Sequence, residues 1–132
     1  MNKLPGTVFV NIDIEKFKRV VQNILDNAKK NIESNKGQLI ITLRETHSSV
    51  ILEFHDNGKG IKREDLPHIF ERFYRSDVAR AVDGSSGLGL AIAKQIVEGL
   101  GGRIWAVSKT DEGTSIIISL KRAVCNEKNI DN

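Results

Sequence analysis

The sequence predicts an α+β fold: a two-layer α/β sandwich in which about three helices cover one face of a mixed, mostly antiparallel sheet of about five strands. Strand-like and helix-like segments follow one another in the order β-α-β-β-α-loop-α-β-β. The strand-like segments alternate apolar with polar residues, as in a sheet with one buried face and one face in water. The two longer helical segments each carry one apolar stripe. Elements with one apolar face bury these faces against one another, which produces two layers.

The totals describe one globular domain. A chain of 132 residues, 39% hydrophobic and 28% charged, is long enough to bury a core. We expect residues 1–122 to form the domain and the polar residues 123–132 to form a disordered tail. The net charge of +3 is mild and the basic residues are scattered, so we expect no nucleic-acid partner. The single cysteine, Cys125, excludes an internal disulfide and favours a reducing compartment.

The N-terminal part predicts a short strand over Thr7–Val10 and then a helix from the N-cap Asp13 to about Ser34. Glu15 lies in the first turn, where the helix dipole stabilises an acidic side chain. Apolar residues recur at spacings of three and four and predict the buried face of this helix: Ile14, Phe17, Val21, Ile24 and Ala28.

The middle of the chain predicts an antiparallel hairpin formed by Gln38–Leu43 and Val50–His55. The segment Glu64–Phe73 predicts a short helix, because its apolar residues share one face and its proline lies in the first turn. Residues 76–86 are polar and without periodicity, and they predict a loop. A long loop inside a compact domain is usually functional or disordered.

The C-terminal part predicts a helix that begins at Gly87–Leu90 and runs to Leu100. Two strands follow, Arg103–Ser108 and Thr114–Leu120, joined by a turn. The helix is predicted to bury Leu88, Ile92, Ile96, Val97 and Leu100.

The stretch Asp56–Gly60, Asp-Asn-Gly-Lys-Gly, combines a carboxylate with two glycines. Strand residues two apart share a face, so Asp56 continues the apolar face of Val50, Leu52 and Phe54. A carboxylate on a buried face needs a hydrogen-bond partner, and glycine lets another group approach the backbone. The stretch therefore suits a flat polar ligand. Asn-Gly after a strand is also typical of a plain hairpin turn, and the stretch alone leaves that interpretation open.

Two further clusters suggest a ligand. Asn23 and Asn27, one helical turn apart, lie away from the apolar stripe of their helix, with Lys30 close by. An ordinary wet surface would show the same pattern. Gly87 and Gly89 precede an apolar helix, whose unpaired N–H groups and dipole form a site for an anion such as phosphate. A glycine-rich entry to a tightly packed helix explains these residues equally well, and they match neither a Walker loop nor a dinucleotide fingerprint.

Together the clusters fit a nucleotide with Mg²⁺. Asp56 could accept a hydrogen bond from an exocyclic amine such as that of adenine. Asparagine oxygens are hard ligands that suit Mg²⁺. Lys30, Arg72 and Arg75 could neutralise phosphate charge, and the segment 62–86 could close over the site and exclude water.

Four motifs, in this order and spacing over roughly residues 7–122, resemble those of sensor histidine kinases. Asn23-x3-Asn27-Ala28 resembles the N box, and Asp56-x-Gly58-x-Gly60 resembles the G1 box. Ile69–Arg75 is similar to the F box and Gly87–Ile92 to the G2 box, while Gly113-Thr114 falls at the position of the family's last turn. The resemblance implies the Bergerat (GHKL) ATP-binding fold, with residues 1–122 as the catalytic domain and ATP and Mg²⁺ as cofactors.

The resemblance also implies a role for each motif. It places Asp56 on the adenine amine, Asn27 on Mg²⁺, and Asn23 nearby on metal or phosphate. It implies that the catalytic residues are Asn23, Lys30 and Arg75, that the metal ligands are Asn27 and Asn23, and that the other nucleotide-binding residues are Gly58, Gly60, Ile61, Ile69, Tyr74, Gly87, Leu88, Gly89, Leu90 and Thr114.

Two features depart from the family pattern. The family often has an aromatic residue after the lysine of the N box, packed near the adenine, where this chain has Asn31. The affinity for the base is then weaker or uses another contact. The family's phosphoacceptor histidine lies on a separate dimerising helix pair, and we expect His47, His55 and His68 to be ordinary surface histidines.

The expected function is that of an ATP–Mg²⁺-binding catalytic domain, monomeric in isolation. It would transfer the γ-phosphate to a histidine on the dimerisation domain of the same parent kinase, in two-component signal transduction. A response regulator would be an indirect partner. The resemblance implies a cytoplasmic domain of a membrane-anchored parent, and no apolar run in this chain reaches transmembrane length.

Three other functions compete with this one on sequence alone, and the residue at position 23 disfavours the first. ATP-hydrolysing relatives of the gyrase, mismatch-repair and heat-shock chaperone group carry a glutamate where Asn23 stands, and asparagine cannot act as a general base. An anti-sigma-type serine kinase shares the fold, but Phe70–Arg75 favours the histidine-kinase branch. A non-catalytic nucleotide-sensing or docking module is left open by Asn31.

Overall fold

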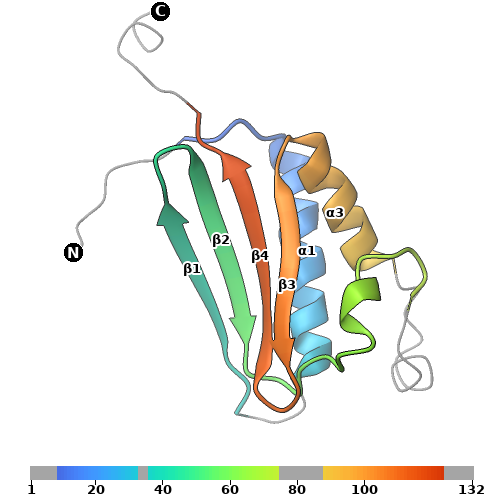
Figure 1. The fold of residues 1–132 in the computed structure, drawn as a ribbon. Helices are drawn as coiled ribbons and strands as arrows, with labels where there is room; N and C mark the ends of the chain where they lie inside the picture. The colour runs from blue at the N-terminus through green and yellow to red at the C-terminus, as the bar shows by residue number, and fades with distance from the viewer. Residues whose placement is uncertain (1–8, 33–35, 75–87, 124–132) are drawn as a thin grey trace, which may run out of the picture.

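The computed structural model describes residues 9–32, 36–74 and 88–123. Figure 1 shows two layers, a four-stranded sheet with two helices against one of its faces. The helices are α1 (Ile14–Asn31) and α3 (Gly89–Gly99), and a short 3-10 turn, η1 (Leu66–His68), lies between them in the chain. The strands are β1 (Leu39–Glu45), β2 (Ser49–Asp56), β3 (Arg103–Lys109) and β4 (Gly113–Lys121). The predicted α+β two-layer class is confirmed.

The sheet differs from the prediction in strand number and direction. Its order is β1-β2-β4-β3, and every described pair is antiparallel, so the sheet is not mixed. The first predicted strand, Thr7–Val10, is wrong over its described half, because Phe9 and Val10 lie outside any strand. The Phe9 carbonyl accepts a hydrogen bond from the Ala123 N–H at 2.7 Å, but no strand ladder forms there.

The core lies between the sheet and the two helices. Strand periodicity places Val50, Phe54 and Asp56 of β2 on the helix side, while Glu53 and His55 lie on the outer face. The main cluster of buried apolar side chains is formed by α1, α3 and the sheet together: Val20, Ile24, Phe54, Leu90, Ala93, Val97, Ile104, Ile116, Ile118 and Leu120.

The predicted buried faces are confirmed in part, because Ile24, Ala28 and Val97 are buried, but the most buried face of each helix is rotated from the predicted one. In α1 the fully buried residues are Val20, Ile24 and Ala28, whereas Ile14 is 63% exposed. In α3 the buried residues are Leu90, Ala93 and Val97. The reason is that the two helices pack against each other as well as against the sheet. The most buried side of each helix therefore lies between its contact with the other helix and its contact with the sheet, and not at the centre of its apolar stripe.

The N-cap of α1 is confirmed, because the Lys16 N–H donates to Asp13 Oδ1 at 3.2 Å. The predicted helix over Glu64–Phe73 is wrong. After one four-residue bond, from the Leu66 N–H to the Lys62 carbonyl at 3.0 Å, its backbone bonds span three residues. His68 donates to Asp65, Glu71 to His68 and Tyr74 to Glu71, at 2.9, 2.9 and 3.3 Å. Pro67 has no N–H to donate, and the φ of 63° at Phe73 lies outside the helical region.

We predict that Ile24→Ala lowers the free energy of unfolding by about 2–5 kcal/mol, because this side chain is only 1% exposed and its removal leaves a cavity. Ile14→Ala removes the same atoms from the same helix at a position that is 63% exposed, and it should cost less than about 1 kcal/mol. Urea denaturation measures both. Equal losses for the two variants would contradict the described core.

Candidate functional site

Asp56 ends β2 on the helix side of the sheet and is only 2% exposed, as the strand periodicity predicts. Its Oδ1 accepts a hydrogen bond from the Gly58 N–H at 2.9 Å. Its neighbour across the sheet is Thr114 of β4, which is fully buried. The described residues 57–74 form no strand after Asp56, so the interpretation of this stretch as a plain hairpin turn is wrong.

The loop Asp56–Gly60 is held between the end of α1 and the turn that joins β3 to β4. The Lys59 N–H donates to the Asn31 carbonyl at 3.1 Å, and the Lys59 carbonyl accepts from the Asp111 N–H at 2.7 Å. A Cβ atom at Gly58 would collide with the Asn31 carbonyl. Gly60 has a φ of 79°, which favours glycine. Both glycines therefore let this loop approach neighbouring backbone closely.

A hydroxyl network joins two predicted site residues to the end of β3. The Ile61 N–H donates to Ser108 Oγ at 2.8 Å, and the Ser108 hydroxyl donates to the Gly113 carbonyl at 3.0 Å. Ser108 Oγ also lies 2.8 Å from Thr114 Oγ1. Ser108 thus positions Ile61 and Thr114 beside the Asp56 loop.

Sequence reasoning missed Ser108, although a signal for it exists. The alternation of β3 places Ser108 on the same face as Ile104 and Ala106, which is the buried face. A polar residue at the end of an apolar strand face is the pattern that singled out Asp56, and it applies equally here.

Three asparagines form a row along one side of α1: Asn23, Asn27 and Asn31, each four residues from the next. In all three the side-chain nitrogen Nδ2 is buried and has no hydrogen-bond partner within the described part of the chain. An unsatisfied buried donor costs about 1–3 kcal/mol. The burial of three such donors disfavours an ordinary wet surface and indicates a place for a ligand with acceptor atoms.

The asparagine row lies between the other predicted motifs. At one end, a Cβ atom at Gly89 would lie 3.8 Å from the side chain of Asn23. At the other end, the Asn31 carbonyl contacts the Asp56 loop. The tertiary structure therefore brings the predicted N-box, G1-box and G2-box stretches together, although they lie far apart in the sequence.

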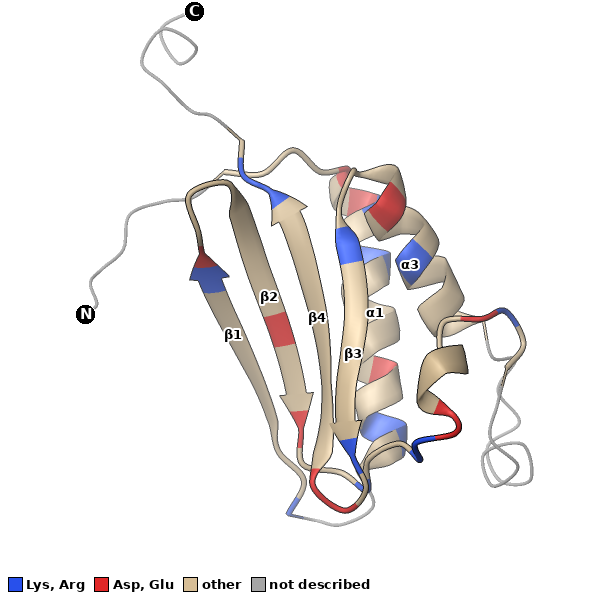
Figure 2. Ribbon diagram, viewed as in Figure 1, with Lys and Arg blue, Asp and Glu red and all other residues tan. Residues whose placement is uncertain are grey.

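Positive charge lies at the C-terminal end of α1, as Figure 2 shows. Lys30 is exposed and occupies the last helical turn together with Lys29. A cation is favourable at this end of a helix dipole and would also attract an anionic ligand. Arg75 and Gly87, two of the predicted phosphate neighbours, lie outside the described residues.

The remaining predicted site residues have other contacts. The Tyr74 hydroxyl donates to the Asp65 carboxylate, and the Tyr74 ring stacks on His68 with 5.0 Å between ring centroids. Leu90 belongs to the buried core, Ile69 packs against that core, and Leu88 is half-buried.

The three histidines lie in three different parts of the fold. His47 is in the turn between β1 and β2, and His68 is in η1 with its Nδ1 2.8 Å from Glu71 Oε2. His55 lies on the outer face of the sheet, with its Nδ1 2.8 Å from Ser115 Oγ. Across the described ranges, no helix is long and apolar enough to cross a bilayer.

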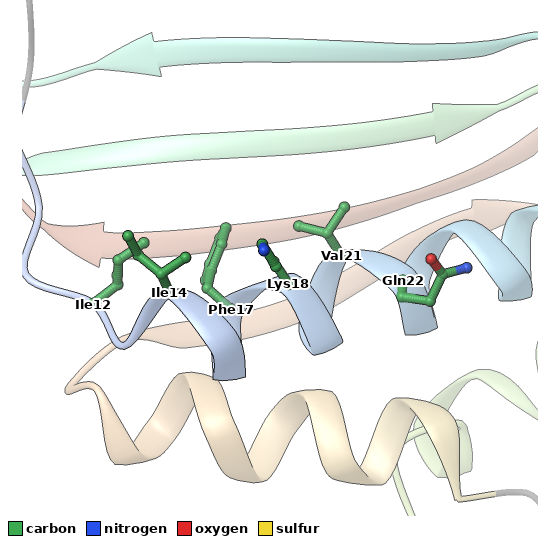
Figure 3. A pocket seen from close by; sticks show the side chains of 6 residues that line it. All are labelled: Ile12, Ile14, Phe17, Lys18, Val21 and Gln22. Carbon is green, nitrogen blue, oxygen red and sulfur yellow. The ribbon is translucent and has the colours of Figure 1, made fainter.

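A separate apolar groove of about 410 Å³ lies along the first half of α1, at the opposite end from Asn31. Figure 3 shows its lining side chains, which project from α1 and the residues before it: Ile12, Ile14, Phe17, Lys18, Val21 and Gln22. None of them is a predicted site residue, so the groove and the asparagine row are different surfaces of the same helix.

Comparison with known proteins supports the motif assignment. The family model described as "Histidine kinase-, DNA gyrase B-, and HSP90-like ATPase" matches residues 12–124. The sensor protein kinase WalK of Staphylococcus haemolyticus is 39% identical over 127 residues, which cover 95% of this chain and 21% of WalK. The chain thus spans about a fifth of the length of this relative.

Two solved structures share the fold and part of the sequence. The mycobacterial sensor histidine kinase MprB aligns with a TM-score of 0.77 and 35% identity, over 88% of this chain and 78% of that one. The catalytic domain of histidine kinase ThkA aligns with a TM-score of 0.72 and 26% identity, over 86% of this chain and 71% of that one. The chain therefore belongs to the histidine kinase-, DNA gyrase B- and HSP90-like ATPase family, as an ATP-binding catalytic domain of the sensor-histidine-kinase type.

Proposed function

We propose that this chain binds ATP together with Mg²⁺ and presents the γ-phosphate to a histidine on the dimerisation domain of the same parent kinase. The observation that carries the proposal is the buried Asp56 carboxylate near one end of a row of buried amide nitrogens on α1, which have no partner in residues 9–32, 36–74 and 88–123. The carboxylate accepts hydrogen bonds and the amides donate them. ATP offers an amine donor on its base and anionic acceptors on its phosphates, and it satisfies both.

Asp56 is proposed to bind the base. Its Oδ1 already accepts from Gly58, and a carboxylate retains acceptor capacity for the adenine amine. Guanine carries a carbonyl in place of that amine, and two acceptors repel. Ile61, Ile69 and Thr114 would line the base site, and Gly58 and Gly60 shape the loop around it.

Asn27 and Asn23 are proposed to bind Mg²⁺ through their amide oxygens, which leaves each Nδ2 to donate to phosphate. Mg²⁺ keeps several waters and bridges phosphate oxygens, so it needs few protein ligands in such a site. Lys30 and Arg75 would neutralise phosphate charge. The other proposed phosphate neighbours are Tyr74 and the G2-box residues Gly87, Leu88, Gly89 and Leu90, at the start of α3.

The chain would contribute positioning and charge neutralisation, which are the main requirements of phosphoryl transfer. The acceptor histidine, with any general base, would come from the dimerisation domain. We also propose that residues 1–122 form the functional unit, that it is cytoplasmic and monomeric alone, and that its membrane-anchored parent passes the phosphate to a response regulator.

Transfer is tested by mixing this domain with ATP, Mg²⁺ and the isolated histidine-bearing helix pair of the same parent. We expect phosphate to appear on the helix pair in an acid-labile, base-stable form, because phosphohistidine has that stability. A helix pair whose acceptor histidine is replaced by alanine is the control. Nucleotide binding without transfer to the matching helix pair would contradict the kinase proposal and favour a nucleotide-sensing module.

We predict that Asp56→Asn weakens the binding of ADP at least about tenfold, because asparagine has a single acceptor oxygen for two donors, the Gly58 N–H and the adenine amine. Calorimetric titration measures the change. Glu53→Gln alters a carboxylate on the outer face of the same strand and should leave the affinity unchanged. Equal affinities for wild type and Asp56→Asn would refute the role of Asp56.

We predict that Asn27→Ala reduces the affinity for ATP at least about tenfold in the presence of Mg²⁺, because a ligand oxygen is lost from the metal site. With EDTA in place of Mg²⁺, the loss should be much smaller. Asp26→Ala is the matched control, because Asp26 is exposed and its carboxylate bonds to Gln22. The same loss with and without the metal would show that Asn27 does not act through Mg²⁺.

A further inference from the structure

We infer that the side-chain amide of Asn31 reads the base, by donating a hydrogen bond to an adenine ring nitrogen that adjoins the amine bound by Asp56. This inference rests on the proposed ATP-binding function and deepens it, because it adds a specificity-determining residue at the position where many sensor histidine kinases carry an aromatic side chain.

The position of Asn31 supports this role. It is the last residue of α1, and its carbonyl accepts the Lys59 N–H at 3.1 Å. Gly58 lies against both residues of the proposed base site. A Cβ atom added to Gly58 would collide with the Asn31 carbonyl, and the Gly58 N–H donates to Asp56 Oδ1 at 2.9 Å. Asn31 and Asp56 therefore lie on either side of one glycine.

The unpartnered amide nitrogen supports a ligand contact over a structural role. Asn31 Nδ2 is buried and finds no acceptor in the part of the chain that the structure describes. The large majority of buried polar side-chain atoms in folded proteins are hydrogen-bonded, to protein or to ordered water, so this one calls for an acceptor from outside the chain. The proposed metal and phosphate contacts use the amides of Asn23 and Asn27, and they leave the amide of Asn31 for another acceptor.

The chemistry of adenine fits a carboxylate and an amide side by side. Its exocyclic amine is a donor, and the ring nitrogens that adjoin it are acceptors. Asp56 would accept a hydrogen bond from the amine, and Asn31 Nδ2 would donate one to the ring nitrogen. A directional hydrogen bond here replaces the stacking area that an aromatic ring would provide at this position.

The test compares ADP binding to wild type and to Asn31→Leu, which keeps the size of the side chain and removes its donor. We expect Asn31→Leu to bind ADP about 3- to 10-fold more weakly, the effect of one hydrogen bond. The analogues 1-deaza-ADP and 7-deaza-ADP each lack one of the two ring nitrogens near the amine. Wild type should bind one of them more weakly than ADP by a similar factor, namely the analogue that lacks the nitrogen bound by Asn31. Asn31→Leu and wild type should bind this analogue with equal affinity, because the hydrogen bond is absent in both.

The controls separate binding from folding. Asn11→Leu makes the same change at an exposed position before α1 and should leave ADP affinity unchanged. In the ligand-free domain, Asn31→Leu should keep or raise the urea midpoint, because it removes an unsatisfied buried donor. A residue with a purely structural role would lower the midpoint together with the affinity.

Two results would overturn the inference and leave the proposed function standing. One is an affinity of Asn31→Leu for ADP that equals or exceeds that of wild type. The other is a loss on Asn31→Leu that is the same for ADP and for both deaza analogues, because the amide would then contact no ring nitrogen. Failure of the wild-type domain to bind ADP at all would overturn the proposed function as well.

Discussion

The site depends on one backbone connection, the pair of hydrogen bonds made by Lys59. Its N–H reaches the Asn31 carbonyl at the end of α1, and its carbonyl accepts the Asp111 N–H in the turn between β3 and β4. These bonds hold the loop after β2 against both a helix and a strand turn. Because they use main-chain atoms, they need the close approach that Gly58 and Gly60 permit. This contact places the Asp56 loop beside Asn31, at the end of the asparagine row.

The asparagine row lowers the stability of the domain, and the packing of the core offsets this loss. Three buried donors that find no partner among the described residues destabilise the ligand-free domain. The same helix contributes Val20 and Ile24, which are almost wholly removed from water, to the contact with α3 and the sheet. Natural proteins commonly accept such a loss of stability at a binding site. The ligand that satisfies these donors would therefore also stabilise the fold, by binding the native state alone.

Helix α1 therefore presents three different surfaces. Its buried face packs on α3 and the sheet, its row of asparagines ends at the Asp56 loop, and its first half borders an apolar groove. The proposed nucleotide site is polar and draws on residues from α1, β2, β4 and the start of α3. This division follows from the geometry of a helix, which presents residues four apart to one side and neighbours about 100° apart to different sides.

The sequence by itself determined the features that depend on local periodicity and motif spacing. They include the burial of Asp56 at the end of β2, the N-cap at Asp13, and the motifs of the ATPase family. Only the tertiary structure decided which side of each helix is most buried, because that depends on the packing of α1 on α3. It also decided that Pro67 and its neighbours form a 3-10 turn, that the Asn31 carbonyl lies beside Gly58, and that the Asn31 Nδ2 atom is buried. Such burial is set by residues distant in the chain, which no local pattern records.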